Sequence, residues 1–439
     1  LPFVGVGLLY RGDKAIQEID QTGLQQDKDH VYDPLSEGLE HVYLDEQPLF
    51  IRVNLTETII WARVWKKTFG ETVTLYLLDA DTDQNQLSER CVTHALYHGS
   101  EESQLKQQLL LGIGGMKLLN LLGIRPALYH LNEGRPAFLH WQLTRQLMEE
   151  HGLEYKTAQA KAREMTVYTN HTLVAAGNNS VDVALLKRFV QHYADKLGIS
   201  LEEMLLAGAE GTTTDRFFMT RFALNSSRKD NGVSTLHSDL SAQTWPGYDW
   251  TNVTNGVHMP TWQSESIRGL VSEAKSPESI DSVKLWQAHL ENKKQLAEFV
   301  HARTGFGYDP ARLVVTWSRR LAGYKRLNDV FADVERLRSI VRAAGRPVQL
   351  LVAGKAHMLD QAGKAMLQQI IKHMATELID HALFIPNYDL EVARYLTRGS
   401  DVWLNIPEYG KEACGTSGMK AASNGVLQCT VADGWAQEV

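Results

Sequence analysis

The last third of the chain alternates short apolar runs with helical patterns, and this rhythm limits the fold more than any other feature. Alternating strands and helices predict an α/β fold with a doubly wound parallel sheet. Ligands of such sheets bind beyond the carboxyl ends of the strands. The strand-like runs are residues 313–317, 348–353, 382–385, 402–404 and 426–431. Helices are predicted at 327–343, from about 361, and at 390–397.

The first two thirds of the chain are less regular. Leucines at helical spacing predict a helix over residues 104–122. Its glycines at 112, 114 and 115 favour helix packing over a phosphate loop, because the helical period continues on both sides. The polar region 211–250 is predicted to be a long loop near a site. Further strands are predicted within residues 2–10, 72–78, 126–134 and 165–172.

Composition excludes several classes of protein. The chain has 439 residues, enough for two or three domains of ~150 residues each. Its net charge of −7, without a basic run, argues against a nucleic-acid partner. The apolar runs are too short for a membrane span. Three cysteines are too few for a disulfide framework and indicate a reducing, cytoplasmic compartment.

Both ends of the chain read as interior sequence. The first ten residues are apolar, but no basic segment precedes them, so a signal peptide is not predicted. There is no initiator methionine, and the chain ends just after an apolar run. We therefore expect a fragment of a longer protein, truncated at both ends.

A glycine-rich stretch at residues 406–420 follows the strand-like run 402–404. Glycines and hydroxyls around Thr416 would let backbone amides converge on an anion, and Lys420 follows within a turn. A phosphate cradle next to an amine suits a phosphorylated aldehyde cofactor, which the amine could hold as a Schiff base. An ordinary glycine-rich turn with a solvated lysine is the alternative.

A basic loop at residues 318–326 places four cations after a predicted buried strand. Arginine can bind phosphate through two nitrogens, and lysine adds a point charge, so the loop could form an anion site. A solvated charged loop is the alternative. The segment 251–262 is rich in hydrogen-bonding groups and could hold a sugar or form a plain interdomain turn.

Other chemistry finds little support. His94 and His98 have helical spacing for a metal site, but no third ligand is evident nearby, so no metal is predicted and surface histidines are favoured. No Gly-x-Ser-x-Gly elbow or zincin helix occurs, and no carboxylate pair suggests a glycosidase.

Together these stretches resemble the α-glucan phosphorylases, the family of glycogen, starch and maltodextrin phosphorylases, most of all its short bacterial and archaeal branch. The most specific block lies in residues 412–425, where Glu-Ala-x-Gly-Thr-x-x-Met-Lys followed by Asn-Gly is similar to the family's cofactor-lysine signature. The other blocks keep the family's order: residues 2–10, 129–136, 168–172, 254–262, 318–326, 353–357 and 387–388.

The resemblance implies two Rossmann-like doubly wound domains facing a cleft, as in GT-B glycosyltransferases. Residues 1–260 would form a glucan-binding domain, incomplete at its start. Residues 261–439 would form a cofactor- and phosphate-binding domain, incomplete at its end. The resemblance also leaves room for a homo-oligomer.

The resemblance further implies pyridoxal 5′-phosphate on Lys420, whose phosphate group exchanges a proton with inorganic phosphate. Inorganic phosphate would cleave terminal α-1,4-glucosyl units of glycogen or maltodextrin with retention, giving glucose 1-phosphate. No catalytic carboxylate pair is needed for this reaction.

Site residues follow by motif match. Arg320 and Lys325 would hold the substrate phosphate, and the carbonyl of His171 would face the positive charge that develops at C1. Four residues would surround the cofactor besides Lys420: Gly415, Thr416, Tyr388 and Trp262. Glucosyl hydroxyls would be held by Asn255, Tyr324, Glu412, His171 and the backbone amide of Cys414.

Two positions depart from the family pattern. Cys414 stands where the family usually has serine, and Arg135 stands where it usually has histidine. The glycine-rich loop of the family's first domain would lie before residue 1, so the fragment itself could be inactive. The alternatives are a nucleotide-sugar glucan synthase of the same architecture and an inactive glucan-binding remnant.

Overall fold

The computed structural model describes residues 2–12, 16–30, 32–96, 99–174, 178–211, 215–343, 345 and 347–439. By its internal contacts the chain forms two compact units. Unit 1 comprises residues 1–14, 29–233 and 238–252, and unit 2 comprises residues 15–28, 234–237 and 253–439. The predicted functional boundary between residues 260 and 261 stays a prediction.

Unit 2 is built on a parallel sheet of five strands in the order β18-β17-β16-β19-β20. Numbered along the chain this order is 3-2-1-4-5, as in doubly wound folds that bind nucleotides. All five predicted strands are confirmed, because buried parallel strands need nearly continuous apolar runs. Their bounds are Leu313–Ser318 (β16), Val348–Ala353 (β17), Ala382–Ile385 (β18), Val402–Asn405 (β19) and Leu427–Thr430 (β20).

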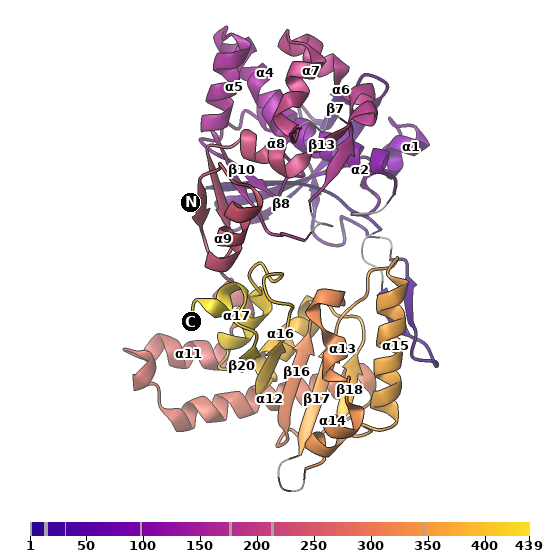
Figure 1. Ribbon diagram of the computed structural model, residues 1–439, viewed down its shortest axis with the longest axis vertical. Coiled ribbons are helices and arrows are strands. Elements are labelled where there is room, and N and C mark those ends of the chain that lie inside the picture. The colour runs from indigo at the N-terminus through magenta and orange to yellow at the C-terminus, as the bar shows by residue number, and fades with distance from the viewer. Residues whose placement is uncertain are drawn as a thin grey trace. The chain divides into compact units, whose positions relative to one another are not determined.

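Helices cover both faces of this sheet (Figure 1). Successive residues of β17 point to opposite faces, so Leu350 and Val352 pack in one core cluster while Leu351 and Ala353 pack in the other. Full burial of each such leucine contributes roughly 1.5–3 kcal/mol. The helices are α10 (Met259–Trp262), α11 (Glu265–Glu273), α12 (Ser282–Thr304), α13 (Leu327–Val330), α14 (Val334–Val341), α15 (Gln361–Ala375), α16 (Leu390–Gly399) and α17 (Thr416–Ala422).

The prediction of one helix over residues 327–343 is wrong in that the helix is not continuous. It is two helices, α13 and α14. The break occurs because Asp333 acts as an N-cap, its carboxylate accepting from the backbone N–H of Arg336 at 2.9 Å.

A hairpin near the chain's start belongs to unit 2. Its strands β2 (Ile16–Ile19) and β3 (Gln25–Lys28) pair antiparallel. In Figure 1 the hairpin is the indigo ribbon beside α15, and Lys364 of that helix forms an ion pair with Asp27 at 2.5 Å.

Unit 1 contains a second parallel sheet, in the order β10-β11-β14-β15. Its strands are β10 (Tyr129–Asn132), β11 (Thr166–Thr169), β14 (Lys229–Gly232) and β15 (Trp250–Asn252). The associated helices are α4 (Leu139–His151), α5 (Tyr155–Glu164), α6 (Val183–Leu197), α7 (Leu201–Leu205), α8 (Met219–Asn225) and α9 (Thr235–Thr244).

A mixed sheet completes unit 1. Only β1 and β9 pair in parallel, whereas β8 pairs antiparallel with β9, β7 and β4. The strands are β1 (Phe3–Leu8), β4 (Glu40–His41), β7 (Phe50–Asn54), β8 (Ile59–Phe69) and β9 (Val73–Asp79). Two small strand pairs, β5 (Tyr43–Leu44) with β6 (Gln47–Pro48) and β12 (Ser180–Asp182) with β13 (Arg216–Phe218), lie in the same unit.

The predicted helix over residues 104–122 is confirmed as a continuous helical segment of α2 (Glu101–Leu109), a π-helical turn (Leu110–Gly114) and α3 (Gly115–Leu121). A Cβ on Gly112 would lie 2.5 Å from the backbone nitrogen of Leu139. The glycine thus allows close packing on the start of α4, as the sequence indicated. None of the described helices is both long and apolar enough to cross a membrane.

The loop predicted over residues 211–250 is wrong. The region contains β13, α8, β14 and α9. β14 was not predicted because its residues, Lys-Asp-Asn-Gly, are polar. The strand forms through hydrogen bonding to β11 and β15. Tertiary pairing here overrides a low strand propensity.

Candidate active site

The loops at one edge of the unit 2 sheet carry most of the predicted site residues. Because the strands are parallel, the loops after β16, β18 and β19 all leave from their carboxyl ends, the usual ligand edge. The predicted residues in these loops and the following helix are Arg320, Tyr324, Lys325, Tyr388, Glu412, Cys414, Gly415, Thr416 and Lys420.

A buried ion-pair cluster forms the centre of this edge. The Glu412 carboxylate accepts from Arg319 Nη2 at 2.6 Å and also from Lys325 Nζ. All three residues are at least nine-tenths buried. Burial by itself would raise the pKa of Glu412, but Arg319 and Lys325 outweigh it and hold that pKa below its usual value. Glu412 therefore stays ionised between two cations.

The cations of this loop differ in their surroundings. Arg319 Nη1 is buried and has no hydrogen-bond partner among the described residues, whereas Arg320 is exposed. The Lys325 ammonium lies 4.5 Å from the centroid of the Tyr324 ring. An unsatisfied buried donor is costly, so the spare nitrogen of Arg319 favours binding of an anion.

Lys420 lies on α17 and faces an aromatic ring. Its Nζ is 4.0 Å from the centroid of the buried Trp262 ring. Burial lowers the pKa of Lys420, which favours the neutral, nucleophilic amine. Asn424 fixes this pairing, because its side-chain amide donates to the carbonyls of Lys420 at 2.9 Å and Trp262 at 3.0 Å.

The turn before α17 is shaped by close backbone contacts. Gly415 has a φ of 86°, a left-handed conformation that favours glycine. The next turn packs against it: a Cβ on Gly434 would lie 2.3 Å from the carbonyl oxygen of Cys414. The amides of Thr416 and Ser417 at the start of α17 have no preceding helical acceptor, whereas the Gly418 amide donates to the Gly415 carbonyl at 3.1 Å. The Ser417 hydroxyl is buried without a partner among the described residues. These groups could bind a phosphate.

The structure brings Cys414 and Asn255 together. The backbone of Asn255 lies near the Cys414 thiol, and burial raises the pKa of that thiol to about 11. The thiol is therefore protonated near neutral pH and is a poor nucleophile.

Tyr388 follows β18 and lines the same edge. It is preceded by Asn387, whose φ of 55° turns the chain sharply. Ser318 at the end of β16 lies beside the Tyr388 hydroxyl, and burial raises the pKa of that hydroxyl. This arrangement joins the loops after β16 and β18.

His171 lies in unit 1, in the loop after β11. Its backbone N–H donates to Glu133 Oε1 at 2.7 Å. Glu133 follows β10, has a φ of 70°, and has a pKa that burial raises to about 7. Burial also lowers the pKa of His171. The sequence did not single out Glu133 as a site residue.

Arg135 and the paired histidines have other surroundings. Arg135 Nη2 donates to Gln107 on α2 at 2.9 Å. His94 is exposed, and His98 lies outside the described residues. In the part of the chain that the structure describes, no group of three or more His, Cys, Asp or Glu could hold a metal ion.

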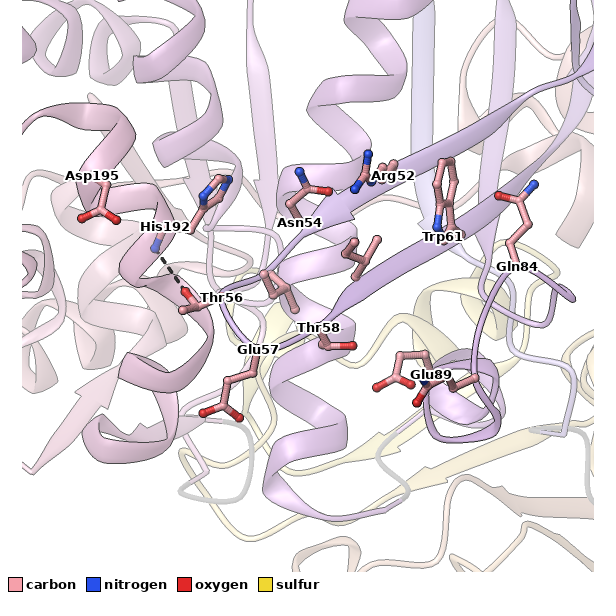
Figure 2. Close-up of a pocket in the computed structure, with 13 residues that line it drawn as sticks. Arg52, Asn54, Thr56, Glu57, Thr58, Trp61, Gln84, Glu89, His192 and Asp195 are labelled. Carbon is pink, nitrogen blue, oxygen red and sulfur yellow. Dashed lines mark hydrogen bonds between the residues drawn. The ribbon is translucent and has the colours of Figure 1, made fainter.

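A separate pocket of about 750 Å³ lies in unit 1, between the β7–β8 hairpin, α1 (Leu87–Arg90) and α6 (Figure 2). None of the predicted site residues lines it. Two of its carboxylates are already paired, Glu57 with Arg188 at 2.7 Å and Glu89 with Lys106 at 3.2 Å. We assign no ligand to this pocket.

Several residues of the site were not selected from sequence: Arg319, Asn424, Ser417 and Glu133. Arg319 is one of the four cations of the basic loop, but no feature of the neighbouring sequence distinguished it from Arg320. Asn424 belonged to the matching Asn-Gly block without a role. Arg319, Asn424 and Glu133 have partners far along the chain, in Glu412, Trp262 and His171, so spacing could not reveal these contacts.

Comparison with known proteins places this site in context. A family model described as carbohydrate phosphorylase matches residues 125–276 and 261–439. The chain is 36% identical to a maltodextrin phosphorylase of Thermococcus litoralis, over 99% of this chain and 56% of that protein. It is 34% identical to a glycogen phosphorylase of Mycobacterium tuberculosis, over 100% of this chain and 56% of the relative.

A third relative, a glycogen phosphorylase of Aquifex aeolicus, is 32% identical over 99% of this chain and 68% of its own length. The chain thus spans just over half the length of the first two relatives.

Proposed function

The chain belongs to the carbohydrate phosphorylase family, and on that premise we propose that the whole protein is a glycosyltransferase of the α-glucan phosphorylase type. It would use inorganic phosphate to release glucose 1-phosphate from terminal α-1,4-glucosyl units of glycogen or maltodextrin, with retention. The observation that carries this proposal is the buried Arg319–Glu412–Lys325 cluster at the same sheet edge as the half-buried Lys420.

The residues at this edge fit pyridoxal 5′-phosphate. Lys420 has a lowered pKa and a flat aromatic neighbour, and it would hold the cofactor through its amine. The turn at Gly415 and Thr416 and the unpartnered Ser417 hydroxyl offer donors for its phosphate. Trp262 and Tyr388 would line its ring. When bound, the cofactor supplies a phosphate group that exchanges a proton with the substrate phosphate.

The cations would hold the substrate phosphate. Arg319 has a spare buried nitrogen, and Lys325 is held by Glu412 within the same cluster. Arg320 is exposed at the start of this loop and would close on the anion when it binds. Fixed cations in a buried place stabilise developing negative charge without reorganisation, which is how such sites lower a barrier.

Neutral and acceptor groups would hold the sugar. Glu412, kept ionised by its two partners, can accept from glucosyl hydroxyls through lone pairs that the cations leave free. Tyr324, Asn255 and the Cys414 amide would add hydrogen bonds. In unit 1, the His171 carbonyl would face C1, and Glu133 would hold the His171 backbone. We accordingly assign glucan binding to residues 1–260 and cofactor and phosphate binding to residues 261–439.

The test uses the full protein that contains this chain. It should bind pyridoxal phosphate, with the lysine-linked absorbance band, and release glucose 1-phosphate from maltodextrin plus phosphate. Lys420→Ala should abolish both. Lys372→Ala, which changes a lysine in the last turn of α15, is the matched control and should change neither.

Two results would overturn the proposal. One is absence of the cofactor band together with activity that Lys420→Ala does not change. The other is incorporation of glucose from a nucleotide sugar in place of phosphorolysis, which would indicate a glucan synthase. Glucan binding without either reaction would indicate a binding remnant.

A further inference from the structure

The β2–β3 hairpin of unit 2 buries two polar side chains that no part of the proposed reaction uses. Gln17 and Gln25 are each only 2% exposed. Glutamine is usually a surface residue, and burying its amide costs free energy unless each polar atom has a partner. The burial of two glutamines in one hairpin therefore indicates that their amide groups make specific hydrogen bonds within the fold.

Gln17 binds two loops at the ligand edge of the sheet. Its Oε1 accepts from the Asn387 backbone N–H at 2.8 Å, and its own N–H donates to Asn387 Oδ1 at 3.3 Å. Its Nε2 donates to the Gly354 carbonyl at 2.9 Å and to Gln25 Oε1 at 2.8 Å. One side chain thus satisfies backbone groups after β17 and after β18.

Both targets lie directly next to the proposed cofactor and phosphate site. Asn387 is the left-handed residue that precedes Tyr388, and a non-glycine residue holds that conformation only when its surroundings support it. Gly354 packs against the basic loop, because a Cβ there would lie 2.1 Å from the Arg319 carbonyl oxygen. Gln17 therefore holds two backbone segments. One is the turn at Asn387, which directs Tyr388, and the other is Gly354, which packs against the loop that carries Arg319.

Gln25 anchors the hairpin at a different point. Its side chain exchanges two hydrogen bonds with the backbone of Ala356, both at 3.0 Å. Asp27 adds the ion pair with Lys364, and Gln368 of α15 donates to Thr22 at the hairpin turn. These contacts dock the hairpin without touching Asn387 or Tyr388.

We propose that Gln17 is a positioning residue of the cofactor site, which acts by holding the Asn387 turn and through it the Tyr388 side chain. The inference rests on the proposed function, since it concerns the pyridoxal phosphate site. The hairpin, although near the chain's start, then forms part of the wall of a site built in unit 2. Gln25, by contrast, docks the hairpin on Ala356 and contacts Gln17, but it makes no hydrogen bond to Asn387.

The test compares three hairpin variants in the full protein, first stripped of pyridoxal phosphate and then titrated with it. Gln17→Met keeps the volume but removes the amide, and the Asn387 N–H loses its acceptor. Loss of such a buried bond should weaken pyridoxal phosphate binding roughly tenfold. Gln25→Met should lower the thermal midpoint of the apoprotein about as much as Gln17→Met does. It should leave the affinity for pyridoxal phosphate within about twofold of the wild type. The exposed Gln26→Met should change neither.

A second measurement does not depend on the cofactor. Hydrogen exchange of the apoprotein should be faster at residues 386–389 in Gln17→Met than in Gln25→Met, because only the first releases the Asn387 turn. If Gln17→Met does not fold, the milder Gln17→Asn, one methylene shorter, should weaken cofactor binding severalfold.

The outcomes separate the two proposals. Cofactor affinity that is unchanged in the Gln17 variants, or lowered equally in Gln17→Met and Gln25→Met, would overturn the positioning role while leaving the proposed function intact. A wild-type protein that binds no pyridoxal phosphate would instead overturn the proposed function.

Discussion

The carboxyl edges of the two parallel sheets differ in how they treat buried charge, and the sheets also differ in strand order. The edge of unit 2 keeps one buried carboxylate ionised, because Glu412 is held between Arg319 and Lys325. The edge of unit 1 favours neutral forms, because burial raises the pKa of Glu133 and of Asp230 to about 7 and lowers the pKa of His171.

This difference agrees with the proposal that both phosphates bind at the unit 2 edge, whereas the unit 1 edge contacts the sugar alone. A phosphate needs fixed cations, and their mutual repulsion has to be balanced by a carboxylate while the site is empty. A sugar is neutral and is bound by hydroxyl, amide and backbone groups, so an unbalanced charge there would be costly. Topology sets where a ligand can bind, and the partners of the buried groups decide which charge it can carry.

The largest expected effect is that of Glu412→Gln, which leaves Arg319 and Lys325 without their carboxylate. Breaking a buried ion pair from one side should destabilise unit 2 by about 3 kcal/mol. Fluorescence of the fully buried Trp317 and Trp403 reports its unfolding. Because the pKa of Glu412 is lowered in the folded state, its stabilisation is present above the unfolded value of 4.5 and is lost as pH falls through the folded value.

Adding inorganic phosphate tests whether the cations of this cluster bind an anion. An anion that replaces the missing carboxylate should restore part of the stability of Glu412→Gln and should stabilise the wild type less. The exposed pair of Lys411 and Glu408 provides the control, since Glu408→Gln should change stability by less than about 1 kcal/mol. Equal stabilisation of wild type and Glu412→Gln by phosphate would contradict an anion site at this edge.

Glu133→Gln tests the neutral edge. The folded pKa of about 7 is above the unfolded value of 4.5, so ionisation of Glu133 opposes folding increasingly as pH rises from 4.5 to 7. Glutamine does not ionise. The variant should match the wild type at pH 4 and exceed its stability by roughly 3.4 kcal/mol at pH 8, because the folded and unfolded pKa values differ by about 2.5 and each pKa unit corresponds to about 1.36 kcal/mol.

Thermal unfolding across this pH range measures the difference, and infrared titration of the carboxyl band locates the pKa directly. Glu154→Gln, at an exposed position before α5, is the control and should show no such trend. A stability difference that is constant with pH would show that Glu133 is ionised throughout.

Arg320→Gln should have a smaller effect, confined to the charged ligand. Loss of a charge-assisted contact costs roughly 1.5–3 kcal/mol, so the KM for phosphate should rise about tenfold or more. The KM for maltodextrin should change less than about threefold, because Arg320 is not among the groups assigned to the sugar. Arg326→Gln is the matched control, since Arg326 is paired with Asp329 at 2.6 Å. Equal effects of both substitutions would mean that only net loop charge matters.

The smallest effect is expected at Cys414. Its pKa of about 11 keeps the thiol protonated, so iodoacetamide at pH 8 should label it much more slowly than the exposed Cys91 and Cys429. Cys414→Ser should change kcat by less than about threefold, because the proposed contact uses the backbone amide. Rapid, inactivating alkylation of Cys414 would contradict this description of the edge.

The parallel sheet of unit 2 was predictable because its central strands, such as β17, are buried on both faces and therefore form nearly continuous apolar runs. β14 was not, since its polar residues give no strand signal and only pairing with β11 and β15 creates it. In the mixed sheet of unit 1, β1 and β9 were predicted from the sequence, whereas β4, β7 and β8 were not. Cytoplasmic location and oligomeric state stay predictions.

Residues of the candidate site could be predicted where they lie close together in the sequence. Contacts between residues far apart in the sequence could not be predicted. Lys420, Gly415 and Thr416 lie close together in the sequence, so their spacing suggested an anion site next to an amine, with an ordinary glycine-rich turn as the alternative. Gln17 reaches Asn387 across 370 positions and Arg319 reaches Glu412 across 93, separations that no local pattern encodes.

By itself the sequence determined the family, the alternation of strands and helices in unit 2, and the glycine turn before Lys420. Only the tertiary structure decided that Arg319 is buried against Glu412 while its neighbour Arg320 is exposed. The physical reason is that neighbouring side chains at the end of a strand point to opposite sides. Whether a charge is paired, neutral or exposed then depends on distant parts of the chain that fold against it.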